Sequence, residues 1–246
     1  MTFINRYLDQ SSAHWGIAPN AARWLFWTPL VISLFLPLLR LDNRIYRAVL
    51  REDGPVEAAT ALVFSVAFVA GALAARHLWK GGYRLQSALY VAFAAVMGFC
   101  AGGGNSWGQR LLGFLTPEAI EEINKQDELT LHNIGNTLDT LKFLMLIGGA
   151  FGAGAYVVNE KLQIQRFWAH ADYLLVPPFF ISSAFFLMFA YRVFRYVFVP
   201  GFHTTITRYG EWIELCFAYG FVVFAVLVYR YVSAAQQVAV ETSVIT

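Results

Sequence analysis

The sequence predicts an all-α, polytopic membrane helix bundle with about six transmembrane helices. Of its 246 residues, 58% are hydrophobic and only 14% are charged, a composition typical of membrane proteins. Six apolar runs approach the roughly 20 residues needed to cross a bilayer. Little sequence is left for a soluble part, so we expect one integral membrane domain covering 1–246. The runs are 24–39, 55–75, 85–103, 134–157, 173–191 and 212–232.

The first and fifth runs are the least regular of the six. The first is short and contains Pro29 and Pro37, and the fifth carries Pro177-Pro178 near its start. Proline removes a main-chain donor and bends or breaks a helix, so we expect a kink in the fifth run. Five or seven crossings remain alternatives.

Two helix openings carry acidic residues. Pro55 suits the first turn of the second run, and Glu57 follows it; residues 210–214 open the sixth run in the same style, with Glu211 and Glu214. Acids near a helix amino end are favoured by the helix dipole. Glu57 and Glu214 also lie one turn into apolar sequence, where an ionisable group is costly and more often functional.

The connection after the third run is expected to contain a short interfacial helix. Thr116-Pro117-Glu118 combines a capping hydroxyl, a first-turn proline and an early acid. Ile120 and Ile123 then give this helix an apolar side. Such a segment can cover a cavity in the bundle.

With six crossings, the acidic clusters all fall on one side of the membrane. Lys and Arg are divided almost equally between the two sides, so the positive-inside rule does not settle the orientation. The compact basic connections 76–84 and 159–172 favour a cytoplasmic amino end. The polar site is then expected on the periplasmic side.

A polar stripe at the start of the fourth run is the strongest candidate for a metal site. Glu128, His132, Asn136 and Asp139 follow one another at spacings of four, four and three. A carboxylate and an imidazole four apart on a helix can share a metal ion, although the same spacing also makes an ordinary hydrogen-bonded pair. With carboxylates from other helices, the candidate ligands of a divalent metal ion are Glu57, Glu128, His132 and Glu214.

The stretch 102–114 places several hydrogen-bonding side chains between two apolar runs. Gln109 and Arg110 are expected to line the wall of the polar pocket, with Arg110 placed to pair with an anionic head group. Together with Asn133 they are the candidate catalytic residues. Small residues at four-residue spacing, such as Gly148 and Gly152, are better explained by close helix packing.

Part of the chain resembles a group of uncharacterised bacterial multi-pass membrane proteins with a pattern E-E-I-S-W-G-Q-R, then T-P-E, then N-L-H-N. The matching residues are 106–110, 116–118 and 131–133, with Asn124, Gln126 and Glu128 between. The resemblance implies a bacterial inner membrane protein and brings no activity with it. The paired glutamates before S-W-G-Q-R are replaced here by Gly103-Gly104-Asn105. Any acids of the site must then come from elsewhere, such as Glu57 and Glu214.

Three functions follow from these patterns. The first is a metal-dependent enzyme acting on a lipid or lipid-linked substrate at the membrane surface. The alternative is a non-catalytic accessory or assembly subunit that binds a partner membrane subunit. The third is a proton-coupled transporter that uses Asp139 and Lys142 inside the fourth run. The chain has no basic surface domain with which to bind nucleic acid.

Overall fold

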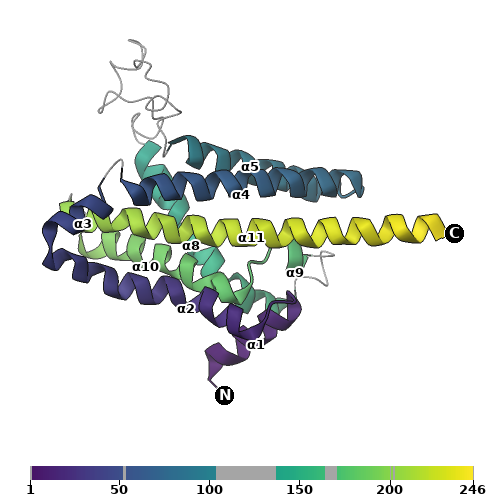
Figure 1. Ribbon diagram of the computed structural model, residues 1–246, viewed down its shortest axis with the longest axis horizontal. Coiled ribbons are helices and arrows are strands. Elements are labelled where there is room, and N and C mark those ends of the chain that lie inside the picture. Colours follow the sequence, from purple (N-terminus) through teal and green to yellow (C-terminus); the bar gives the residue numbers. More distant parts are fainter. Residues whose placement is uncertain are drawn as a thin grey trace, which may run out of the picture.

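The computed structural model describes residues 2–51, 54–103, 137–163, 171–199, 201 and 203–245, and these segments form an all-α bundle (Figure 1). Six of the described helical segments are long and apolar enough to cross a membrane, which confirms the predicted polytopic fold. The predicted interfacial helix at 116–118 lies outside the described residues. The candidate spans are Pro19–Leu41, Pro55–Lys80, Arg84–Gly103, Thr140–Leu162, Phe179–Phe198 and Thr204–Gln236.

The helices form three layers around the long last helix. The hairpin of α4 (Pro55–Lys80) and α5 (Arg84–Gly103) packs on one side of α11 (Thr204–Ile245) through α4. On the other side, α10 (Ser182–Phe198) contacts both α11 and α8 (Thr137–Leu162). Figure 1 shows the α4–α5 hairpin at the top of the view and α11 running through the middle.

The amino-terminal part of the chain supplies the third layer. It consists of α1 (Phe3–His14), α2 (Pro19–Phe35), the 3-10 helix η1 (Leu36–Leu41) and the short α3 (Asn43–Val49). Helix α2 packs against α10, and α1 against α2. Helix α1, the first of this layer, is amphipathic and lies below α2 in the view of Figure 1.

Two span boundaries differ from the prediction because of local sequence signals. Pro177-Pro178 separates α9 (Ala171–Leu174) from the 3-10 turn η5 (Phe179–Ile181), so the fifth span starts after the prolines and is not merely kinked. Helix α11 begins at Thr204, so Glu211 and Glu214 do not open it and the expected dipole role for them is wrong. The predicted opening of α4 at Pro55 is confirmed.

Prolines in the first span leave carbonyl groups without a helical donor, and tyrosines of α11 bind them. Pro37 cannot donate to Ser33 four residues earlier, and the Tyr209 hydroxyl donates to that carbonyl at 2.8 Å. Pro29 lies inside α2 and likewise frees Leu25 O, where the Tyr219 hydroxyl lies at 3.4 Å. A neighbouring helix that satisfies the freed carbonyl is what makes proline tolerable in a span.

The same compensation holds the broken start of the fifth span. Pro178 cannot donate to Leu174 O, and the buried Tyr90 hydroxyl of α5 donates to it at 2.7 Å. After the prolines, the Phe179 amide donates to Ser11 Oγ of α1 at 2.9 Å. These bonds join α5 and α1 to one irregular segment.

Removal of the Tyr209 hydroxyl should destabilise the protein. In the Tyr209→Phe variant the Ser33 carbonyl loses its hydroxyl donor, and an unsatisfied buried acceptor costs about 1–3 kcal/mol. We expect that loss in the free energy of unfolding measured by titration with denaturing detergent. Exposed Tyr196 makes no hydrogen bond to a described side chain or main chain, so Tyr196→Phe is the matched control. Equal stability of the two variants would contradict this account.

The predicted small-residue faces are confirmed as close helix contacts within the chain. Gly152 of α8 faces the ring of Phe185, and Gly71 of α4 faces the ring of Phe93. Gly148 lies against Phe217. Side chains of the same molecule therefore fill the space next to these glycines.

Candidate functional site

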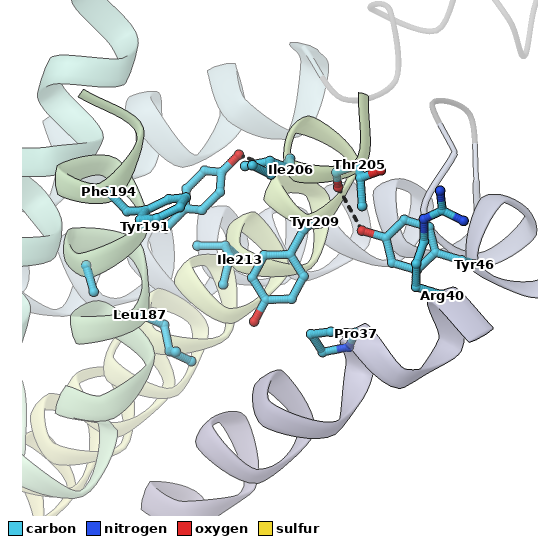
Figure 2. A pocket seen from close by; sticks show the side chains of 11 residues that line it. Pro37, Arg40, Tyr46, Leu187, Tyr191, Phe194, Thr205, Ile206, Tyr209 and Ile213 are labelled. Atoms are coloured by element: carbon cyan, nitrogen blue, oxygen red, sulfur yellow. Dashed lines mark hydrogen bonds between the residues drawn. The ribbon is translucent and has the colours of Figure 1, made fainter. Parts of the chain in front are cut away.

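An apolar groove of about 480 Å³ lies between the first span and the last two, at the membrane end where α10 ends and α11 begins. Figure 2 shows Arg40 and Tyr46 at one end of it and Leu187 and Phe194 at the other. Most of its wall is hydrocarbon or aromatic ring. The lining residues are Pro37, Arg40, Tyr46, Leu187, Ala190, Tyr191, Phe194, Thr205, Ile206, Tyr209 and Ile213.

Short turns at the end of the first span place Arg40 and Tyr46 beside the groove. Pro37 lies in the first turn of the 3-10 helix that carries Arg40, and Asp42 then caps α3 by accepting hydrogen bonds from the amides of Arg44 and Ile45. A capping carboxylate of this kind fixes where a short helix starts. Tyr46 is thereby turned inward, where it is only 2% exposed.

The Tyr46 hydroxyl ties α3 to the last helix. It donates to the main-chain oxygen of Thr205 at 2.8 Å, as the dashed line in Figure 2 marks. Burial raises the pKa of Tyr46, and the nearby guanidinium groups of Arg40 and Arg208 act in the opposite direction. The hydroxyl is therefore a protonated donor at neutral pH, and two cations lie within electrostatic range of this end of the groove.

Tyr191 forms the wall between the groove and the bundle interior. Its hydroxyl donates to Ile206 O at 3.0 Å. Gly210 permits this contact, because a Cβ at that position would lie 2.6 Å from the Tyr191 hydroxyl. The α10–α11 junction is therefore closed by a tyrosine that needs a glycine opposite it.

Behind Tyr191, a buried ion pair joins α10 to α11. Arg192 Nη2 lies 3.1 Å from Glu214 Oε1 and 2.8 Å from the Met145 sulfur of α8. The Arg192 side chain is 9% exposed, and the Glu214 side chain is 34% exposed. The Arg192 Nε atom is buried without a hydrogen-bond partner among the described residues. A guanidinium this buried depends on a carboxylate partner, and among the described residues that partner is Glu214.

Arg195 lies one turn further along α10 and adds a second cation. Its Nη1 atom is buried and has no hydrogen-bond partner in the described part of the chain. Glu211 of α11 is half-buried. The interior side of the α10–α11 junction is thus polar, whereas the groove side is apolar.

Five predicted site residues lie outside the described residues: Gln109, Arg110, Glu128, His132 and Asn133. The structure therefore does not test whether His132 and Glu128 share a metal ion. The described helices on either side of this stretch can be placed. Helix α5 ends at Gly103 and α8 begins at Thr137 at the end of the bundle where α4 and α11 also begin (Figure 1).

The two predicted acids that are described lie at this same end. Glu57 is in the first turn of α4 and is half-buried. Glu214 pairs with Arg192. Residues next to the two acids in the sequence belong to one hydrophobic cluster, which contains Val56 and has Trp212 and Leu215 packed against it. Among the described residues, no group of three or more His, Cys, Asp or Glu side chains could hold a metal ion.

The tyrosine-lined groove did not follow from the sequence patterns. Its walls come from residues about 150 positions apart, and each is unremarkable in a chain with 12 tyrosines. Pro37 is the one local signal, since a proline near the end of a span requires a donor from a neighbouring helix. In the structure, the donor to the Ser33 carbonyl is the Tyr209 hydroxyl.

Comparison with known proteins adds no relative. No protein-family model, no curated protein and no solved structure matches the chain.

Proposed function

We propose that this multi-pass membrane protein is an enzyme acting on a lipid or lipid-linked substrate, whose apolar portion lies in the tyrosine-lined groove. The groove is the observation that carries the proposal. It is apolar, opens at a membrane end, and has Arg40 at one end. Pockets that combine an apolar wall with a few placed polar groups are typical ligand sites.

Arg40 is suited to an anionic head group. Its side chain is exposed, and no described acidic side chain pairs with it. A guanidinium can bind a phosphate through two parallel hydrogen bonds. The acyl or isoprenoid part of the ligand would then pass along Leu187 and Ile213. The substrate class is thus an amphiphile with a negative head group.

The reactive groups are proposed to come from the polar residues that follow α5 in the sequence. Gln109, Arg110 and Asn133 remain the proposed catalytic residues, and His132, Glu128 and Glu57 the proposed ligands of a divalent metal ion. A bound metal would supply an activated water. We assign Glu214 instead to the neutralisation of Arg192, because a metal on that carboxylate would compete with its 3.1 Å ion pair.

The accessory-subunit alternative loses part of its support. It drew in part on small-residue faces, and Gly148 and Gly152 are packed against Phe217 and Phe185 of the same chain. For the transporter, Lys142 is half-buried in α8, and the side chain of Asp139 is not described. Neither observation favours an accessory or a transport function over an enzyme whose substrate lies in the groove.

Ligand binding to the groove can be tested with fluorescent phosphatidic acid and with diacylglycerol carrying the same label. We expect the purified protein in uncharged detergent to prefer phosphatidic acid, because only it carries the phosphate. Arg40→Gln should weaken that binding by about tenfold, the equivalent of one lost charge-assisted hydrogen bond. Ala190→Trp, which places a large side chain at a half-buried position of the groove wall, should weaken both ligands.

The control for the filled groove is Phe186→Trp, since Phe186 is 51% exposed on the same helix and does not line the groove. Enzymatic turnover is followed separately by mass spectrometry of a membrane lipid extract incubated with the protein. His132→Ala should abolish the product while phosphatidic acid still binds. Binding unchanged in Arg40→Gln and Ala190→Trp would overturn the groove as the substrate site.

A further inference from the structure

A second groove, of about 500 Å³, runs along the outer face of the α4–α5 hairpin. Residues at helical spacing line it from both helices, and its floor is largely alanine. The α4 stripe runs from Phe68 to Trp79, or about 16 Å at a rise of 1.5 Å per residue. None of its residues lines the tyrosine-lined groove. They are Phe68, Ala72, Ala75, Arg76 and Trp79 from α4, and Ser87, Val91, Ala94 and Ala95 from α5.

One end of this second groove is strongly basic. Arg76 lines it, and Lys80 and Arg84 flank the turn that joins the two helices; all three side chains are exposed. The sequence contains no Asp or Glu between Glu57 and Glu118. No acidic side chain of the hairpin therefore neutralises these cations.

At the basic end of the groove, the side chain of Arg84 is held in a fixed position. Its guanidinium carbon lies 3.9 Å from the centre of the Trp79 ring, which is a cation–π contact. Trp79 itself lines the groove. Tryptophan prefers the level of the lipid head groups, so this contact marks the membrane interface. The guanidinium is thus presented where phosphates of the bilayer lie.

The floor of the groove is fixed by a buried hydrogen bond. The Ser87 hydroxyl donates to Ala75 O at 2.8 Å, which satisfies the hydroxyl group of the lining. The wall of the groove is consequently apolar apart from its basic end at Arg76. It suits a hydrocarbon chain that runs parallel to the helices.

We propose that the α4–α5 groove is a binding site for an anionic phospholipid. An acyl chain lies over Ala72 and Ala75, and Arg76 and Arg84 hold the phosphate. Basic pockets between transmembrane helices are suited to anionic head groups. A helix of a second copy fits less well, because it would bring the same cations together at the basic end.

The test uses native mass spectrometry of the full-length protein in uncharged detergent, titrated with phosphatidylglycerol or with phosphatidylcholine of the same acyl chains. We expect tighter binding of phosphatidylglycerol. The double variant Arg76→Gln/Arg84→Gln should weaken it by about 30-fold, from the loss of two interfacial cations. Ala72→Phe should weaken both lipids, since it obstructs the groove and leaves the charges.

The control is Lys161→Gln/Arg230→Gln, which removes two exposed cations from α8 and α11 instead. Its binding should stay within about twofold of the wild type, because neither residue lines the groove. Equal affinity for the two lipids, or equal weakening in both double variants, would overturn a specific site. A dimer that Ala72→Phe disrupts and phosphatidylglycerol does not affect would identify a second copy as the occupant and overturn the proposal. The weakening caused by Arg76→Gln/Arg84→Gln should be the same in an Arg40→Gln background, so this site and the proposed function are tested separately.

Discussion

Glutamine in place of Glu214 should destabilise the protein by on the order of 3 kcal/mol. The Glu214→Gln variant leaves the Arg192 guanidinium, 9% exposed, without the carboxylate that lies 3.1 Å away. An uncompensated buried charge is costly because the bundle interior solvates it poorly. The free energy of unfolding in a denaturing-detergent titration measures the loss.

A double replacement separates the ion pair from simple packing. Arg192→Met combined with Glu214→Leu removes both charges, and hydrophobic replacements of a buried pair are often neutral. We expect the double variant to be more stable than Glu214→Gln alone. The control is Glu160→Gln, whose 3.9 Å pair with exposed Arg6 is worth less than about 1 kcal/mol. A double variant as unstable as the single one would show that the charge itself is not the cause.

Alanine at Gly152 should separate α8 from α10 and cost about 3 kcal/mol of stability, near the upper end of the range for overpacked cores. A Cβ at this position would overlap the ring of Phe185. That ring cannot retreat, because it is 1% exposed and Gly220 of α11 borders it on another side. Thermal unfolding in detergent gives the measurement.

The neighbouring Gly154 supplies the control on the same helix. A Cβ there would meet no atom within 4 Å, so Gly154→Ala should be neutral or stabilising by up to about 1 kcal/mol through helix propensity. Phe185→Leu should partly restore the Gly152→Ala variant, since it shortens the side chain that the new methyl group meets. Equal effects at the two glycines would refute the close-contact explanation.

The membrane spans could be predicted because each is a local property of the sequence. The run predicted at 55–75 became α4, which opens at the same first-turn proline and continues to Lys80, 26 residues in all. The starts of α10 and α11 were harder to predict from the sequence. Pro177-Pro178 ends one helical segment before the next begins, and the polar residues before Glu211 concealed two further turns of α11.

The site was harder to predict because its contacts join distant spans. Helical spacing marks Glu214 as an unusual acid inside apolar sequence, but its partner Arg192 lies on another helix. The groove depends on Tyr46, Tyr191 and Tyr209, whose hydroxyls donate to main-chain oxygens that no periodicity reveals. The predicted metal ligands His132 and Glu128 stay a prediction, outside the described residues.

The proline carbonyls of the first span have a consequence for the order of assembly during synthesis. Leu25 and Ser33 on α2 receive their hydroxyl donors from Tyr219 and Tyr209, nearly two hundred residues later in the chain. Ser183 of α10 donates to Phe26 O of the same helix at 2.6 Å. Helix α2 therefore enters the membrane early with carbonyls that have no lasting partner. Its carbonyls gain these donors only once α10 and α11 have packed against it, so this early span is among the last of the six described spans to be fixed in place.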